Sequence, residues 1–103
     1  MAIKRVTTRD AAQVIFDRED FRTSGALYGE SCSLGSFDRG RLYGEDLERF
    51  YADCGSIRYV VMSYATPIAW WVPPTDTDKG GWYKVKGKFS VTTTKHQSNL
   101  YKI

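Results

Sequence analysis

Histidine, cysteine and long apolar runs are scarce in this sequence, and each scarcity excludes a class of protein. His96 is the only histidine, and the two cysteines, Cys32 and Cys54, form no CxxC pair, so the sequence excludes a zinc site. Small disulfide-stabilised domains normally carry more cysteines, which favours two reduced thiols here. No apolar run approaches the roughly 20 residues that a membrane span needs.

The N-terminal residues lack the pattern of a secretion signal. Residues 1–6 carry charge but no apolar stretch follows them. We therefore expect a protein that stays in the cytoplasm where it is made and has no contact with a membrane.

Acidic residues are absent after Asp78, and arginine is absent after Arg58. Residues 1–78 carry nine basic and twelve acidic side chains, whereas residues 79–103 carry six lysines and no acid. The net charge of +3 is therefore the sum of −3 over residues 1–78 and +6 over residues 79–103. Such a split indicates a surface for nucleic acid or for an acidic partner, or only a charged surface that favours solubility.

The composition is sufficient for one hydrophobic core. The chain has 103 residues, the usual size of one domain, and 42% of them are hydrophobic and 15% aromatic, which argues against disorder. We expect a single domain spanning residues 1–103.

Two segments of the first half have helical patterns. A first helix should begin at a Thr8 cap and end near Asp17. A second should follow Glu45 and Asp46 and stop at Gly55. Its predicted apolar stripe comprises Leu47, Phe50, Tyr51 and Cys54.

β-Branched and aromatic residues predict three strands in the second half. Residues 57–64 and 68–72 are close enough to form a hairpin that is interrupted at Pro67, and residues 82–89 alternate between an apolar and a lysine-rich face. Shorter strands are expected in residues 21–30. Strands grouped apart from helices predict an α+β fold, with a small antiparallel sheet of about three to five strands and two or three short helices on one face.

The strand at residues 82–89 suggests a nucleic-acid-binding face. Trp82, Lys84, Lys86 and Lys88 would project from one side of it, with the lysines about 7 Å apart. This spacing approaches that of phosphates along one DNA strand, and a tryptophan can stack on a base. The alternative is an edge strand whose lysines prevent aggregation between sheets.

His96 is the one candidate for catalysis. Thr92 or Thr93 could cap a short last helix that continues through Leu100, and Thr92 and His96 would then share a helix face. A hydroxyl–imidazole pair is part of a nucleophilic site, but catalysis also needs an orienting acid and an oxyanion site, and the sequence places neither. A structural cap or core hydrogen bond is the alternative, so we expect a protein that is not an enzyme.

Trp70 and Trp71 are consecutive in a predicted strand, so their side chains point to opposite faces of the sheet. We expect Ile68 and Val72 to share the face of Trp70, and Ala69 to share that of Trp71. If only one face is buried, one indole is exposed, as is typical of a binding hot spot. The alternative is a helix on each face.

No motif for a metal or a cofactor is complete. Residues 75–78 read Thr-Asp-Thr-Asp, but the glutamate of a calcium loop would fall at Gly87. The glycines of residues 29–44 are not followed by the GK[ST] of a phosphate loop. We expect neither a metal nor a cofactor.

Two segments resemble small proteins of actinobacterial phages, of the mycobacteriophage type. Those proteins carry a YxTPIAW element followed by a YSVTTxxHQ element, which correspond here to parts of residues 59–70 and 89–97, with Phe89 in place of the usual tyrosine. The resemblance covers roughly residues 57–97. Its motif residues include Thr66, Pro67, Thr92, Thr93 and His96.

The resemblance implies a phage accessory protein in the host cytoplasm, and it brings no known activity with it. Some small phage proteins hinder host growth by binding a host component. Our leading hypothesis is therefore a non-enzymatic binder of a host protein that uses the region of Trp70 and Trp71 or the adjoining loop. Nucleic-acid binding through the lysine face is the alternative, and a hydrolase or nuclease using His96 is the weakest hypothesis.

Overall fold

The computed structural model describes residues 3–23, 25–31, 40–53, 55–64, 66–77, 79–87 and 91–103. The expectations for Cys32, Cys54 and Lys88 fall outside these residues. In this described part, no helix is long and apolar enough to cross a membrane.

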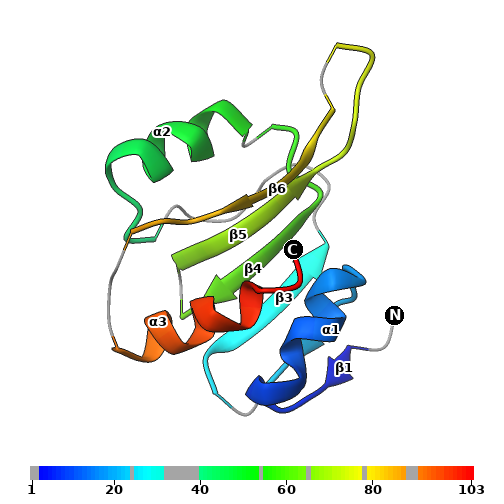
Figure 1. The fold of residues 1–103 in the computed structure, drawn as a ribbon, viewed down its shortest axis with the longest axis vertical. Helices are drawn as coiled ribbons and strands as arrows, with labels where there is room; N and C mark the ends of the chain where they lie inside the picture. The colour runs from blue at the N-terminus through cyan, green and yellow to red at the C-terminus, as the bar shows by residue number, and fades with distance from the viewer. Residues whose placement is uncertain are drawn as a thin grey trace.

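The described strands form one mixed sheet of six strands, in the order β1-β2-β3-β4-β5-β6 (Figure 1). They are β1 (Lys4–Arg5), β2 (Phe21–Arg22), β3 (Leu27–Ser31), β4 (Tyr59–Ser63), β5 (Thr66–Val72) and β6 (Gly81–Lys84). Strands β1 and β2 are parallel, and the other neighbouring pairs are antiparallel. The α+β class is confirmed, but the sheet is larger than predicted and not wholly antiparallel.

Three α-helices and two 3₁₀ turns accompany this sheet in the described residues. They are η1 (Thr8–Asp10), α1 (Ala11–Phe16), α2 (Gly44–Asp53), α3 (Val91–Gln97) and η2 (Ser98–Leu100). The predicted N-caps are shifted. Thr7, not Thr8, accepts the amide of Asp10 at 3.2 Å, and Thr92 and Thr93 lie within α3 instead of preceding it.

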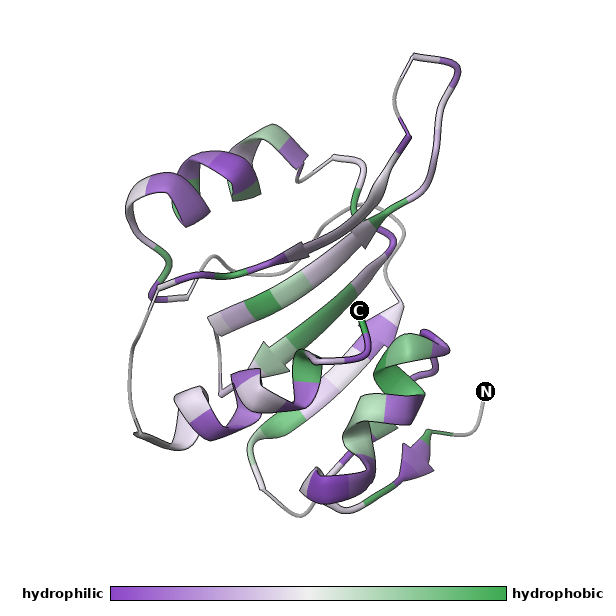
Figure 2. Cartoon of the chain, in the orientation of Figure 1, coloured by the Kyte–Doolittle hydropathy of each residue, from purple (hydrophilic) through white to green (hydrophobic). Residues whose placement is uncertain are grey.

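Helices cover both faces of the sheet, which corrects the expectation of helices on one face. Helix α2 lies on one side, and α1 and α3 lie on the other (Figure 1). The reason is in β4, where all five residues are buried, so both of its faces need cover. Figure 2 shows the same pattern, with hydrophobic colour concentrated on the central strands and hydrophilic colour on the outer surfaces of α2 and α3.

Each face of the sheet has its own core. On the side of α1 and η2, the cluster contains Val14, Ile15, Phe21, Leu27, Tyr59, Val61 and Leu100, among others. On the side of α2, it contains Leu42, Phe50, Ile57, Val60, Met62, Trp70 and Val85. The sheet therefore separates two hydrophobic layers, and the central strands contribute to both.

A register shift in β5 changes which residues share a face. Val61 pairs with Ala69, but the next residue, Met62, pairs with Pro67, so Ile68 is an extra residue on β5. Consequently Ile68 and Ala69 both belong to the cluster on the α1 side. The expected grouping of Ile68 with Trp70 was wrong, because strict alternation does not hold across a bulge.

Candidate functional site

Trp70 is fully buried beneath α2, at 0% exposure. Its ring stacks on Tyr83 at 5.0 Å between centroids and meets Phe50 edge-on at 5.6 Å. Its indole Nε1 donates a hydrogen bond to Asp53 Oδ2 at 2.9 Å. Trp70 therefore has no surface for a partner, and its proposed binding role is corrected to a role in the core.

Trp71 points to the other face and is half-buried. The guanidinium of Arg18 lies 4.2 Å from the centre of its ring, a cation–π contact. Its cross-strand neighbours are aromatic, because Trp71 pairs with Tyr59 on β4 and with Trp82 on β6. Both faces of the sheet are thus covered by helices, as in the alternative considered for the two indoles. Of the two, only Trp71 retains accessible surface.

The predicted lysine face is divided between the two sides of the sheet. Trp82 is half-buried in the α1-side cluster and meets Tyr59 edge-on at 5.7 Å. Lys84 Nζ donates to the main-chain oxygen of Ile103 at 2.9 Å, whereas Lys86 Nζ reaches Glu45 on α2 at 3.3 Å. Strand β6 ends at Lys84, so the period-two alternation expected through residue 89 does not continue.

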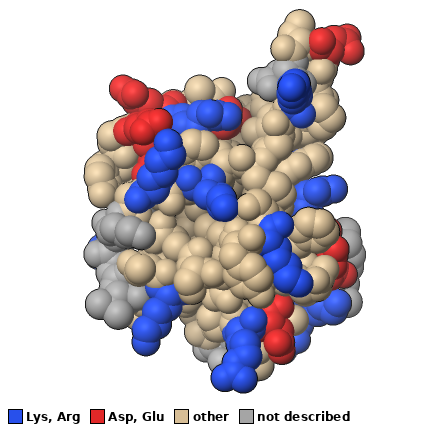
Figure 3. Space-filling view, viewed as in Figure 1, with Lys and Arg blue, Asp and Glu red and all other residues tan. Residues whose placement is uncertain are grey.

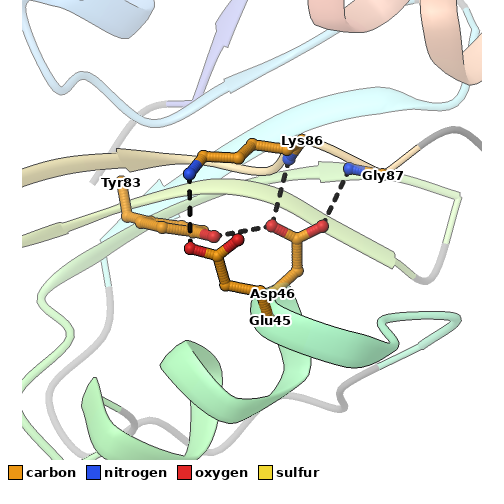
Figure 4. Close-up of polar contacts among 5 residues, drawn as sticks. All are labelled: Glu45, Asp46, Tyr83, Lys86 and Gly87. Atoms are coloured by element: carbon orange, nitrogen blue, oxygen red, sulfur yellow. Dashed lines mark hydrogen bonds and ion pairs between the residues drawn. The ribbon is translucent and has the colours of Figure 1, made fainter.

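Asp46 holds α2 against the segment that follows β6 (Figure 4). The residue is 4% exposed, and its carboxylate accepts hydrogen bonds from the Tyr83 hydroxyl at 2.6 Å, the Lys86 amide at 3.0 Å and the Gly87 amide at 2.8 Å. Burial, followed by the hydrogen bond to Asp46, raises the pKa of Tyr83 well above its usual value. One carboxylate thus satisfies three donors.

Gln97 of α3 completes this arrangement from the opposite face. Its Nε2 donates to the carbonyl oxygens of Val85 and Gly87, each at 3.0 Å. The backbone of residues 85–87, which leaves the sheet, is therefore hydrogen-bonded by side chains of two helices. Gln97 Oε1 is buried and has no hydrogen-bond partner in the described structure.

His96 takes part in a buried cluster of hydroxyl groups. Its Nδ1 lies 2.6 Å from Ser63 Oγ, which in turn lies 3.1 Å from Thr93 Oγ1. Ser63, at the end of β4, is 0% exposed, and Thr93 and His96 are 3% and 5% exposed. Thr92, the threonine expected to share a face with His96, is exposed instead. This geometry links α3 to β4 through the core, and such burial leaves little access for a substrate.

Burial lowers the pKa of His96 below its ordinary value, because the charged imidazolium is less stable away from water. The folded state thus favours the neutral ring more than the unfolded state does. The contribution of neutral His96 to stability is therefore complete above the pKa of the unfolded state, near 6.5. It is lost as the pH falls towards the lower pKa of His96 in the folded state.

We therefore expect the free energy of unfolding to decrease as the pH is lowered from 7.5 to 5, with a slope of at most about 1.4 kcal/mol per pH unit from this one proton. Urea unfolding at several pH values measures it. The control is His96→Gln, which keeps a hydrogen-bonding group beside Ser63 but does not titrate. If both proteins show the same pH dependence, His96 is not the responsible group.

The remaining motif residues, Thr66 and Pro67, are buried at the start of β5. Thr66 is buried, and its Oγ1 accepts the amide of Arg41 at 3.1 Å. Pro67 is fully buried as the second residue of β5, near the strand start predicted for it. Among the described residues, no group of three or more His, Cys, Asp or Glu side chains is arranged to hold a metal ion.

Comparison with known sequences matched residues 5–102 to a family of unknown function, DUF8033. The chain belongs to this family. No curated protein and no solved structure gave a significant match.

In this DUF8033 member, the two segments quoted for the phage resemblance meet in the core. Ser63 comes from residues 59–70, and Thr93 and His96 come from residues 89–97. Sequence reasoning missed Ser63, because a serine within an apolar run carries no periodic signal. The one available signal was that Ser63 closes a strand predicted to be buried, because a buried hydroxyl group needs a hydrogen-bond partner in the core.

Proposed function

We propose that this protein is a phage accessory protein that acts by binding a host protein, with the β5–β6 loop, residues 73–80, as its contact surface. The loop projects beyond the rest of the molecule (Figure 1). Residues 74–77 and Lys79 are exposed. The phage origin rests on the resemblance of residues 59–70 and 89–97, and the contact surface rests on this projection.

The base of the β5–β6 loop is constrained, which favours recognition over a passive linker. Gly80 has φ of +65°, and a Cβ there would collide with the carbonyl oxygen of Val72 and the backbone of Pro73. Gly81 has φ of +117°, and Pro73 and Pro74 restrict the other arm. The two prolines restrict one arm of the loop, so that arm loses less conformational entropy on binding than an unrestricted chain would.

The geometry favours a protein partner over a nucleic acid. The ring of Trp82 is half-buried and packs against Tyr59, so it does not form a flat stacking platform. Lys84 and Lys86 extend to different sides of the sheet instead of forming one row. The loop residue Asp76 adds negative charge, which would repel phosphates.

The test is capture from a lysate of an actinobacterial host, with the tagged full-length chain as bait and mass spectrometry as readout. We expect one component to be retained by the wild type and reduced at least about tenfold with a double variant, Asp76→Arg and Thr77→Arg. The matched control is Glu48→Arg with Thr94→Arg, which changes exposed residues on α2 and α3. All three baits must show the same melting temperature.

Two outcomes would contradict the proposal. One is equal retention of the component by the loop variant and the wild type. The other is the absence of any component that the wild type retains above beads without bait.

A further inference from the structure

An open pocket of about 350 Å³ lies beside β6, on the side of α3 and η2. Lys84, Val85 and Lys86 line one part of it, and Gln97, Leu100 and Tyr101 line another. Tyr101 is the most exposed of the large hydrophobic side chains described, at 69%. The pocket is therefore lined by apolar residues, two lysine residues and an exposed aromatic ring.

Strand β6 has a free edge along this pocket. It is the last strand of the sheet in the described residues, and its only strand neighbour is β5. The Val85 amide donates to the Ile68 carbonyl oxygen at 2.9 Å, so the Lys84–Ala69 pair is of the non-hydrogen-bonded type. The backbone N–H and C=O of Lys84, and by alternation those of Trp82, therefore point away from β5 towards the open edge.

The chain segment that contains this edge carries basic but no acidic side chains. Residues 79–103 contain six lysines and no acid. Lys86 has an acidic neighbour on α2, Glu45, but the pair is 3.3 Å apart with side chains 68% and 72% exposed, and such pairs add little stability. Figure 3 shows basic side chains spread over the face that carries α3, with acidic side chains in smaller groups among them and at the edges.

Gln97 supplies an unsatisfied acceptor in the same place. Its Nε2 is occupied by two carbonyl oxygens, which fixes the orientation of the amide, and its buried Oε1 lacks a partner in the described structure. Buried acceptors without partners are rare in folded proteins.

We propose that this pocket binds an extended acidic peptide segment, which adds to the free edge of β6 as a further strand. Backbone hydrogen bonds to Trp82 and Lys84 would position the segment. Side chains of an added strand alternate between the two faces of the sheet, so one carboxylate would reach Lys84 on the α3 side and another would reach Lys86 on the α2 side. This inference rests on the proposed function, because it names the kind of segment that the host partner offers. Strand β6 directly follows the β5–β6 loop, so one partner can contact both.

Two other occupants fit less well. A second copy of this chain would bring lysines against lysines at the same edge. A nucleic acid would leave the strand-like backbone groups of Trp82 and Lys84 without matching partners, because a phosphate backbone offers acceptors but few donors.

The experiment measures fluorescence anisotropy of the full chain with a labelled peptide of sequence ETVETVETV. We expect saturable binding that weakens at least about tenfold in Lys84→Glu with Lys86→Glu, and that weakens with added salt. Lys95→Glu, on the exposed surface of α3 and outside the pocket, is the matched control and should bind like the wild type. A peptide N-methylated at alternate amides should also bind at least about tenfold more weakly, because strand addition needs those N–H groups.

Several results would overturn the inference. These are no binding up to about 1 mM peptide, equal binding by the charge-reversed variant, or equal binding of the N-methylated peptide. Tighter binding of a single-stranded oligonucleotide of the same charge would assign the edge to nucleic acid, and self-association that is lost in Lys84→Glu would assign it to a second copy. Each of these leaves the proposed function standing if the β5–β6 loop variant still loses the host component, so the two failures are distinguishable.

Discussion

The Asp46→Ala variant should lose at least about 3 kcal/mol of unfolding free energy, because three donors in partly buried hydrogen bonds lose their common acceptor. A hydrogen bond to a charged group is worth about 1.5 to 3 kcal/mol, and donors left without partners add the cost of their desolvation. In a domain of this size, such a loss lowers the melting temperature by more than about 10 °C. Urea unfolding and a thermal melt measure both quantities.

The adjacent residue provides the control for this prediction. Glu45→Ala removes the exposed ion pair with Lys86 and should cost no more than about 1 kcal/mol. Asp46→Asn should fall between the two, because one amide oxygen remains an acceptor while its –NH₂ opposes the amides of Lys86 and Gly87. If Asp46→Ala is as mild as Glu45→Ala, the carboxylate does not hold α2 in place.

Asp46 also explains why the buried face of α2 differs from the predicted stripe. The helix itself was predicted near its observed bounds, with Glu45 and Asp46 at its start and Gly55 as its stop, against the observed Gly44–Asp53. Leu47 and Phe50 of the predicted stripe do pack towards the sheet, together with Asp46 and Asp53, but Tyr51 is 57% exposed. Hydrophobic periodicity treats carboxylates as solvent-facing, but Asp46 and Asp53 accept hydrogen bonds from Tyr83 and Trp70. The predicted stripe therefore included Tyr51 and missed the two carboxylates.

The longer strands were predicted from the sequence, and β1 was not. The hairpin of β4 and β5 followed from β-branched and aromatic residues over five and seven positions. Strand β1 has two residues, too few for any period, and its pairing with β2 depends on contacts that are distant in sequence. The bulge at Ile68 was equally invisible, because one extra residue in a strand leaves composition unchanged.

The candidate sites were harder to predict than the fold class, because they are formed by residues that only the tertiary structure brings together. The sequence placed His96 near hydroxyl groups, but its partner Ser63 is 33 residues away. The sequence also placed Lys84 and Lys86 on one strand face, but β6 ends between them. Local periodicity predicts which side of an element a residue occupies, and it cannot predict what the opposing element brings to that side.

Alanine variants of Trp70 and Trp71 should have different effects, the first on stability and the second on binding. Trp70→Ala should cost about 3 to 5 kcal/mol, because it empties a fully buried site between Phe50 and Tyr83 and leaves Asp53 without its indole donor. Folded proteins of this kind have only about 5 to 15 kcal/mol in total, so much of this variant should be unfolded at 37 °C. Urea unfolding followed by circular dichroism measures the loss.

Trp71→Ala should behave differently, although it changes the same residue type at the next position. The side chain is half-buried and its cation–π contact with Arg18 lies at the protein surface, so we expect a loss of about 1 to 2 kcal/mol and a folded protein. Since Trp71 lies at the base of the β5–β6 loop, this folded variant should retain less of the host component. Trp70→Phe, which keeps an aromatic ring in the core, should retain it fully. If Trp71→Ala unfolds the chain as completely as Trp70→Ala, Trp71 is a core residue like its neighbour, and any contact with the partner must come from the loop alone.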